Sequence, residues 1–251
     1  MNREVLFAKT LEDVRKLAKE QGNCVSEEQV KDAFAALDLD NDQLQMVFDY
    51  LVKHKVGIGQ PVDPDEYLTD DKQWIPKEHR LSFRGFMDRT VYTKVKPELV
   101  MPEEQRVFPD PNNVSYIPEL IEKLGGVDIC FGGIGINGHV AFNEPDDSMT
   151  PEEFLAQKTR VLDISKETRA VNSIGDLNGA LDDMPHYCIT IGINEISQAR
   201  KIRLGCFRDW HRSVVRHAAY GEKSAHFPVS LLQDHADINI RFTEFVANLP
   251  E

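Results

Sequence analysis

The stretch that decides the fold is Phe131-Gly-Gly-Ile-Gly-Ile-Asn-Gly-His-Val-Ala-Phe-Asn-Glu-Pro-Asp146, which continues the mostly apolar run Val127–Phe131. An apolar run that enters a glycine-rich loop is typical of a buried strand in an α/β sheet. We therefore predict that residues 127–131 form a central strand. The loop should then lie at the carboxyl end of this strand, where open α/β sheets bind ligands.

The glycines of this loop match the GxGxxG motif of dinucleotide-binding folds at Gly133, Gly135 and Gly138. In those folds the third glycine lies at the start of a helix, whereas Pro145 and the polar residues after it close a loop here. We therefore do not expect a nicotinamide or flavin site. The loop also carries His139 and Glu144, which could move a proton near neutral pH or could simply tie down a turn.

The rest of the chain beyond residue 80 alternates between strand and helix patterns. Strands are expected at Tyr187–Ile191, Ile202–Phe207 and Ile238–Phe242, and a helix is expected at Trp210–Tyr220. This alternation predicts an α/β fold built on an incomplete Rossmann-like, mostly parallel sheet with flanking helices.

The first quarter of the chain has a different pattern and predicts a small three-helix module. Three amphipathic segments lie between residues 9 and 56, and Ser26 and Gln29 have the spacing of a capping box. The proline-rich acidic stretch 57–80 separates the two parts, so we place the domains at residues 1–59 and 60–251. The apolar residues that we expect the module to bury together are Val14, Val30, Ala33, Phe34, Leu37, Val47, Phe48 and Leu51.

The composition excludes several classes of protein. The net charge is −13, and residues 1–71 hold 8 Lys and Arg against 16 Asp and Glu. A chain this acidic, without a basic patch, is not expected to bind nucleic acid directly. It has no apolar run long enough for a membrane span and no secretory signal, and its four cysteines are scattered. We expect a cytoplasmic protein without disulfides, metal or cofactor.

The complete glycine loop, with its Gly-His and Ala-Phe-Asn-Glu-Pro segments, resembles the signature loop of the glucosamine-6-phosphate deaminase/isomerase family. Further resemblance covers residues 65 to 251. It includes Asp65-Glu-Tyr67 as the family's acidic catalytic loop and Ser82–Met87 as the helix after it. Other matching segments are the arginine-bearing strand and loop at 158–160 and 167–173, the next strand at 184–192 and the C-terminal helix at 228–235. The related 6-phosphogluconolactonases share the glycine-rich entry but differ after Gly138-His139.

The resemblance implies a sugar-phosphate substrate and a reaction that opens the ring of an amino sugar, moves a proton between C2 and C1 and releases ammonia to give fructose 6-phosphate. Asp65 would be the base, and His139 would move the proton of the ring oxygen. The orienting residues would be Asn137 and Glu144. The substrate-binding residues would be Gly132, Gly133, Gly135 and Arg212, and further anions could bind Arg160 and Arg169.

Three departures from the family lead us to expect that catalysis is weak or lost. The family's opening strand–helix units, which carry its phosphate loop, have no counterpart in residues 1–56. A helix start rich in glycine is a strong physical requirement for phosphate binding. In addition, Asn137 replaces a carboxylate, and Ile174 stands where the family has an arginine.

The first 60 residues resemble region 1.1 of bacterial primary sigma factors, a small acidic helical module. This resemblance implies a basic protein partner such as RNA polymerase. Two alternatives to an active deaminase therefore stay open: a non-catalytic regulator that uses its acidic module, and a 6-phosphogluconolactonase-like hydrolase. The sequence also leaves open whether the chain forms a homo-oligomer.

Overall fold

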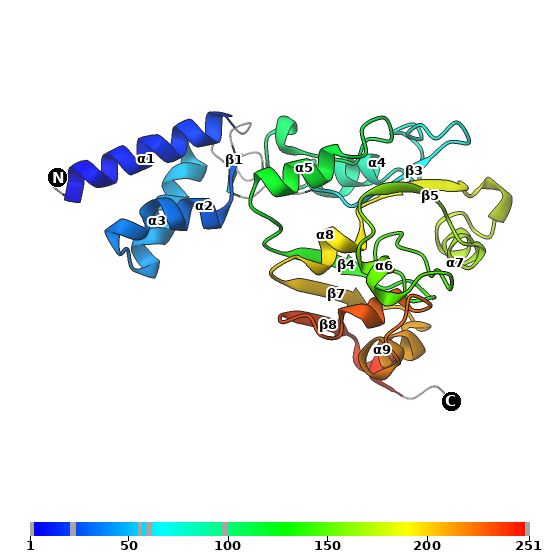
Figure 1. Cartoon of the computed structure of the whole chain (residues 1–251). Coiled ribbons are helices and arrows are strands. Elements are labelled where there is room, and N and C mark those ends of the chain that lie inside the picture. The colour runs from blue at the N-terminus through cyan, green and yellow to red at the C-terminus, as the bar shows by residue number, and fades with distance from the viewer. Residues whose placement is uncertain (1–2, 21–23, 55–56, 59–61, 97–99, 249–251) are drawn as a thin grey trace.

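In a computed structural model of the chain, residues 3–20, 24–54, 57–58, 62–96 and 100–248 are described. A helical module at the N-terminus lies to one side of a larger α/β body (Figure 1). None of the described helices is both long and apolar enough to cross a membrane. The predicted domain boundary between residues 59 and 60 falls outside the described residues.

The N-terminal module consists of three helices and a short parallel strand pair. Ser26 and Gln29 form the expected capping box, in which each side chain accepts a hydrogen bond from the other residue's backbone N–H. Asp40 and Gln43 make the same reciprocal bonds at the start of the third helix. The elements are α1 (Arg3–Glu20), β1 (Cys24–Val25), α2 (Glu27–Phe34), a 3₁₀ turn (Ala35–Leu37), α3 (Asn41–Lys53) and β2 (Gly57–Ile58).

The module has a hydrophobic core of its own. The predicted core residues are buried in it, except that Phe48 is only partly buried and Ala33 is exposed. Because Phe34 and Leu37 continue the buried face of α2 into the 3₁₀ turn, Ala33 points away from the core. The module also contacts the body, since Arg200 forms ion pairs with Glu28 of α2 and with Asp128.

A parallel three-stranded sheet forms one half of the body, in the order β4 (Cys130–Gly133), β7 (Ile202–Cys206), β8 (Ile238–Phe242). The central strand β7 buries Ile202, Leu204 and Cys206. These side chains belong to one hydrophobic cluster with Val214 and Val215 of α9 (His211–Tyr220). The predicted α/β class, with its parallel sheet and flanking helices, is confirmed.

The prediction of a central strand at residues 127–131 is wrong. β4 begins at Cys130 and lies at the edge of its sheet, where β7 is its only partner among the described residues. The Phe131 side chain is 70% exposed. Apolar composition does not distinguish a central strand from an edge strand, and the central position belongs to β7.

The second sheet is antiparallel and contains β3 (Asp65–Leu68), β6 (Tyr187–Thr190) and β5 (Arg160–Asp163), with β6 in the middle. Asp65–Tyr67 therefore lies in a strand rather than in the expected loop. Residues 167–173, expected as part of a strand and loop, lie in helix α7 (Lys166–Asp176), which Ser165 caps. The expected helix at 228–235 is a 3₁₀ turn over Pro228–Leu232.

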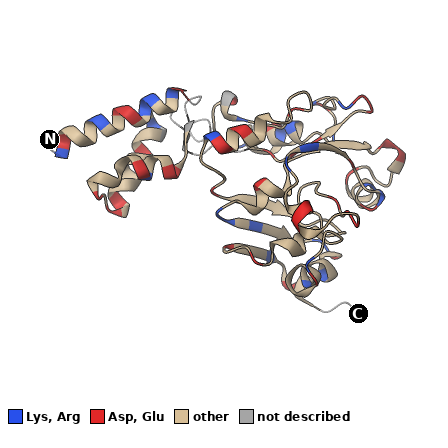
Figure 2. Cartoon of the chain, viewed as in Figure 1, with Lys and Arg blue, Asp and Glu red and all other residues tan. Residues whose placement is uncertain are grey.

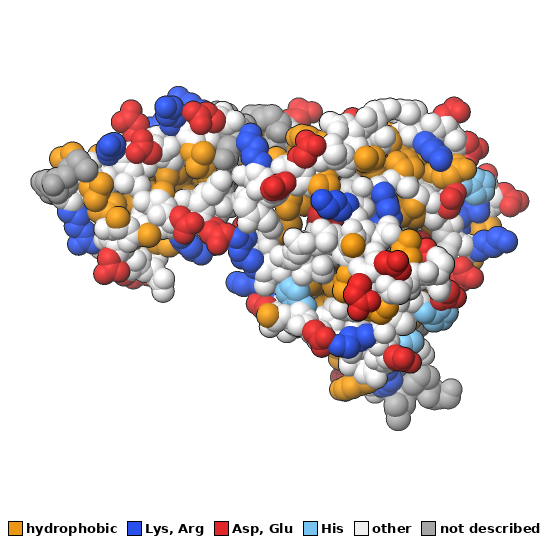
Figure 3. Space-filling model, in the orientation of Figure 1, with side chains coloured by type: hydrophobic (Ala, Val, Ile, Leu, Met, Phe, Trp, Pro, Cys, Tyr) orange, Lys and Arg blue, Asp and Glu red, His pale blue; other side chains and the backbone are white. Residues whose placement is uncertain are grey.

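The remaining elements are short: α4 (Phe83–Met87), a π-helical turn (Asp88–Tyr92), 3₁₀ turns at Glu103–Gln105 and Leu181–Asp183, α5 (Tyr116–Lys123), α6 (Pro151–Leu155), α8 (Ile193–Ser197) and α10 (Glu244–Ala247). Acidic residues are spread over the module and the body (Figure 2). On the face shown in Figure 3, basic side chains alternate with acidic ones and form no continuous basic patch.

Candidate functional site

A cavity of about 360 Å³ lies where β4 and β7 end, beside the start of β3. Four of the predicted site residues line it: Asp65, Gly133, Gly135 and His139. The glycine loop therefore lies at the carboxyl end of its strand, as predicted. Gly132 is not among the residues that line the cavity, and Asn137 and Glu144 lie behind His139.

The imidazole of His139 is held on one side by polar groups. Its Nδ1 lies 2.7 Å from Asn137 Oδ1, 3.2 Å from Thr168 Oγ1 and 3.5 Å from Glu144 Oε2. Because Asn137 Oδ1 can only accept, Nδ1 carries a hydrogen. This arrangement leaves Nε2 as the ring nitrogen that can exchange a proton with a ligand in the cavity.

Asn137 and Glu144 form a network with the capping residue of α7. Asn137 Nδ2 donates to Glu144 Oε2 at 2.8 Å and to Ser165 Oγ at 3.2 Å, which turns its carbonyl oxygen toward His139. Burial alone would raise the pKa of Glu144, but the hydrogen bonds with His139, Asn137 and Thr168 hold it below its ordinary value. Glu144 Oε1 is buried and lacks a hydrogen-bond partner among the described residues.

Two glycines allow this packing. A Cβ on Gly135 would lie 2.0 Å from the His139 ring, so only glycine lets the ring approach the backbone there. Gly138 has a φ of +84°, and a Cβ on it would meet the Phe227 ring at 2.6 Å. The Gly135 N–H donates to the His139 carbonyl oxygen, so it is not available to bind a substrate, although Gly135 is one of the predicted substrate-binding residues.

Asp65 is the buried carboxyl group of the cavity, with 7% of its surface exposed. Thr190 Oγ1 donates to its Oδ1 at 2.5 Å. Burial raises the pKa of Asp65 to about 7, although the Thr190 hydrogen bond and the nearby His139 lower it. A carboxyl group with this pKa can serve as a general base near neutral pH.

The neighbouring Glu66 has a structural role that the sequence did not reveal. Its fully buried carboxylate accepts hydrogen bonds from Ser82 Oγ, from the backbone N–H groups of Phe83 and Arg84, and from Arg84 Nε at 2.9 Å. These bonds fix the start of α4 and place Phe83, which lines the cavity. Glu66 thus positions one wall of the site.

Arg208 is the only Lys or Arg among the described residues that line the cavity. Its backbone N–H donates to His211 Nδ1 at 2.8 Å, and His211 Nε2 lies 3.0 Å from the Ile134 carbonyl oxygen. Burial lowers the pKa of His211, which favours a neutral ring that joins the loops after β4 and β7. Arg208 is the first basic residue after β7, but no motif in the sequence marks it as a residue of the site.

The structure does not bring the predicted cationic residues to the cavity. Arg212 lies over the Phe245 ring, 3.7 Å from its centroid. Arg160 donates to Asn143 Oδ1, and Arg169 donates to the carbonyl oxygens of Leu181 and Met184. All three lie outside the set of residues that line the site.

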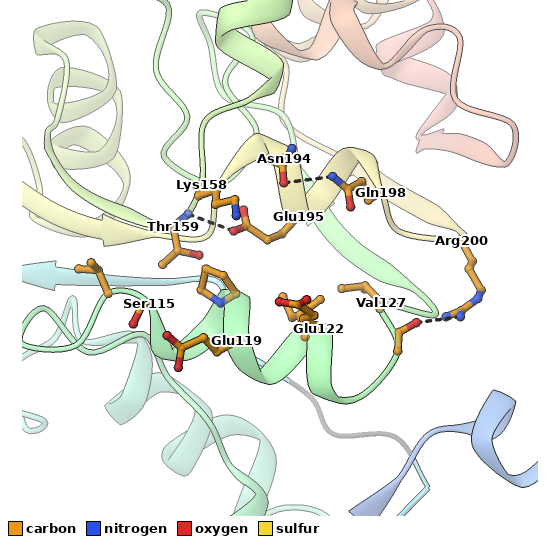
Figure 4. A pocket seen from close by; sticks show the side chains of 15 residues that line it. Ser115, Glu119, Glu122, Val127, Lys158, Thr159, Asn194, Glu195, Gln198 and Arg200 are labelled. Atoms are coloured by element: carbon orange, nitrogen blue, oxygen red, sulfur yellow. Dashed lines mark hydrogen bonds between the residues drawn. The ribbon is translucent and has the colours of Figure 1, made fainter.

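A second, larger cavity of about 880 Å³ shares no lining residue with the first. Glu119 and Glu122 of α5 form one wall, and Thr159 and Glu195 face them from the other (Figure 4). Glu195 Oε1 accepts from the Thr159 N–H, while Glu195 Oε2 and Thr159 Oγ1 are buried without a hydrogen-bond partner among the described residues. None of the predicted site residues lines this cavity.

Comparison with curated proteins finds many glucosamine-6-phosphate deaminases. The one from Clostridium beijerinckii is 30% identical over 190 residues, which cover 74% of this chain and 73% of that protein. The one from Mycolicibacterium smegmatis is 29% identical over 183 residues, covering 72% and 67%. No family model matches the chain.

Comparison with solved structures supports the same fold. A monomeric glucosamine-6-phosphate deaminase aligns with a TM-score of 0.65 and 21% identity, covering 100% of this chain and 98% of that one. The 6-phosphogluconolactonase from Trypanosoma brucei aligns with a TM-score of 0.51 and 13% identity, covering 98% and 95%. At these identities the likeness concerns the fold alone. The resemblance of residues 1–60 to sigma factor region 1.1 stays a prediction.

Proposed function

Since the chain belongs to the glucosamine-6-phosphate deaminase family, we propose that it converts an amino-sugar phosphate, glucosamine 6-phosphate, into fructose 6-phosphate and ammonia. One observation carries the proposal: Asp65 and His139 line the same cavity, and His139 is oriented from behind by Asn137 and Glu144. A buried base and an oriented imidazole are the two proton-transfer groups that this reaction needs.

In the proposed reaction, His139 Nε2 moves the proton of the ring oxygen and so opens the ring. Asp65 then takes the proton from C2, and C1 receives it. Water adds at C2 of the resulting imine, and ammonia leaves. A pKa of about 7 lets Asp65 both take up a proton and return it near neutral pH.

The proposed site offers few cationic groups to the phosphate of the substrate. Arg208 is the cation that a phosphate could reach, and its guanidinium can bind two phosphate oxygens at once. We therefore assign the phosphate to Arg208 in place of Arg212. Neither the Gly135 amide nor a second described cation is available to assist it.

The deciding experiment measures ammonia release from glucosamine 6-phosphate by the purified chain. The expected result is a measurable rate that is lost in Asp65→Asn. Hydrolysis of 6-phosphogluconolactone, measured on the same samples, tests the lactonase alternative. Lactone hydrolysis without ammonia release would replace the deaminase proposal by the hydrolase.

A separate proposal concerns the N-terminal module, which we infer to bind a basic protein partner. It is supported by the module's own hydrophobic core and by its excess of acidic residues, since residues 1–59 hold 11 Asp and Glu against 8 Lys and Arg. Binding of the full chain to purified RNA polymerase should weaken steeply with salt if charge drives it. Absence of binding at low salt would contradict this proposal.

A further inference from the structure

Thr190 contacts both Asp65 and the loop that carries His139, the two parts of the proposed site. It lies on the central strand β6, directly opposite Asp65 of β3 in the antiparallel register, and is fully buried. Its hydroxyl donates to Asp65 Oδ1 and accepts the N–H of Phe142 at 3.0 Å. Phe142 belongs to the loop that carries His139, so a single oxygen atom contacts both the base and the loop of the proton shuttle.

We propose that Thr190 is a positioning residue. Its hydroxyl orients the Asp65 carboxylate and holds the loop that carries His139 against strand β6. This inference rests on the proposed function, because it assigns Thr190 a part in the same reaction. The Phe142 N–H occupies a lone pair of Oγ1, which leaves the single hydroxyl hydrogen for Asp65 or for the Ile191 carbonyl oxygen at 3.2 Å.

The surroundings of Asp65 explain why one hydroxyl matters. The charged and titratable groups nearby are His139 on the glycine loop, Asp63 before β3, Tyr67 on β3, Cys188 on β6, Cys130 on β4 and Arg160, which faces Thr190 from β5. Arg160 is engaged by Asn143 rather than by Asp65. The Thr190 hydroxyl is therefore a neutral donor that favours the ionised carboxylate in this buried place.

The test compares Thr190→Val, which removes the hydroxyl at similar volume, with Thr190→Ser, which keeps it. Thr159→Val is the matched control, because Thr159 is also buried and its hydroxyl has no hydrogen-bond partner among the described residues. Titration of the Asp65 carboxyl by ¹³C NMR, assigned with Asp65→Asn, needs no turnover. Thr190→Val should raise this pKa by about one to two pH units, since a hydrogen bond to a charged group is worth about that much.

In Thr190→Val, the acid limb of the pH profile of kcat/KM for ammonia release should move to higher pH by the same amount. Thr190→Ser and Thr159→Val should both keep the pH profile of the unmodified chain. Exchange of the Phe142 amide hydrogen should be faster in Thr190→Val. Should Thr190→Val not fold, Thr190→Ala, which also lacks the hydroxyl, takes its place. An unchanged Asp65 titration in the folded hydroxyl-free variant would overturn the proposal. A shifted titration in a chain that releases no ammonia would support Thr190 and refute the deaminase function.

Discussion

His139 is the side chain whose loss should affect the reaction most directly. Its Nδ1 contacts Asn137, Thr168 and Glu144, so Nε2 is the nitrogen that exchanges a proton with the substrate. His139→Ala should lower kcat/KM for ammonia release by roughly 10²–10⁴-fold, the usual contribution of a positioned acid–base group. His186→Ala is the matched control, because that histidine is exposed and pairs with Asp70 at the surface. Equal rates in the two variants would rule out His139 as the shuttle.

Asp65 should make the protein less stable as the pH rises. Its pKa is about 7 in the folded chain against 3.8 for the ordinary group, so the folded state holds more protons between about pH 4 and pH 7. Stability is therefore lost as the pH rises through this window, by on the order of 4 kcal/mol in full. Asp65→Asn should be more stable than the parent at pH 8 and nearly equal to it near pH 4.

Urea unfolding at several pH values measures this difference. Asp182→Asn, which changes an exposed carboxyl group, should show no pH-dependent gain. A constant difference between Asp65→Asn and the parent across the pH range would show that the Asp65 carboxyl is not destabilised by burial.

The sequence indicates which residues of one long motif belong to the same site. It does not indicate which residues distant in the chain the fold brings to that site. His139, Glu144 and Asn137 lie within eight positions of one loop, so the sequence groups them. Thr190 and Asp65 are 125 positions apart and meet only through strand register. Arg208 was missed because the sequence does not tell which of Arg208 and Arg212 faces the cavity; the start of α9 at His211 turns Arg212 onto Phe245.

At the scale of elements, three of the four predicted strands match the structure closely, whereas the strand predicted at residues 127–131 begins at Cys130 and ends at Gly133. β8 has the predicted bounds, and β6 and β7 differ from prediction by one residue at one end. Pairing was not predictable from composition: β6 lies in an antiparallel sheet and β4 lies at an edge. Both features depend on which segments lie alongside, and that information is not contained in a strand's own residues.

The edge position of β4 predicts a contrast between two large apolar side chains of the parallel sheet. Phe131 is 70% exposed on β4, whereas Leu204 is 1% exposed on the central strand β7. Phe131→Ala should cost less than about 1 kcal/mol of unfolding free energy. Leu204→Ala should cost about 2–5 kcal/mol, because it leaves a cavity in the core. Denaturant titration of both variants checks this, and a large loss for Phe131→Ala would show that β4 is covered in solution.

At the scale of the whole molecule, the N-terminal module and the body are joined by few described interactions. The module buries its own cluster around Phe34 and Leu51, and Arg200 bridges it to the body through Glu28. The proline-rich acidic stretch 57–80 predicts a division into two domains, which stays a prediction.

The whole chain should turn over weakly, because its phosphate side lacks cations. A dianionic phosphate is normally held by a helix N-terminus and two cationic side chains, whereas Arg208 is the only Lys or Arg among the described residues that line this cavity. Each missing charge-assisted bond is worth about 1.5–3 kcal/mol, so two of them weaken binding by roughly a hundredfold or more. Ile174, 72% exposed on α7 beside the cavity-lining Gly175, is where a cation can be added.

Ile174→Arg should therefore lower KM for glucosamine 6-phosphate, while Asn137→Asp should act on kcat by giving His139 a second carboxylate partner. Tyr220→Arg, which adds the same charge at a site 90% exposed and outside the cavity lining, is the control for net charge. Steady-state ammonia release by the unmodified chain, the three single variants and the double variant Ile174→Arg/Asn137→Asp separates the two effects. If the unmodified chain already turns over as fast as Ile174→Arg/Asn137→Asp, another segment supplies the phosphate contacts and the weak-turnover prediction is wrong.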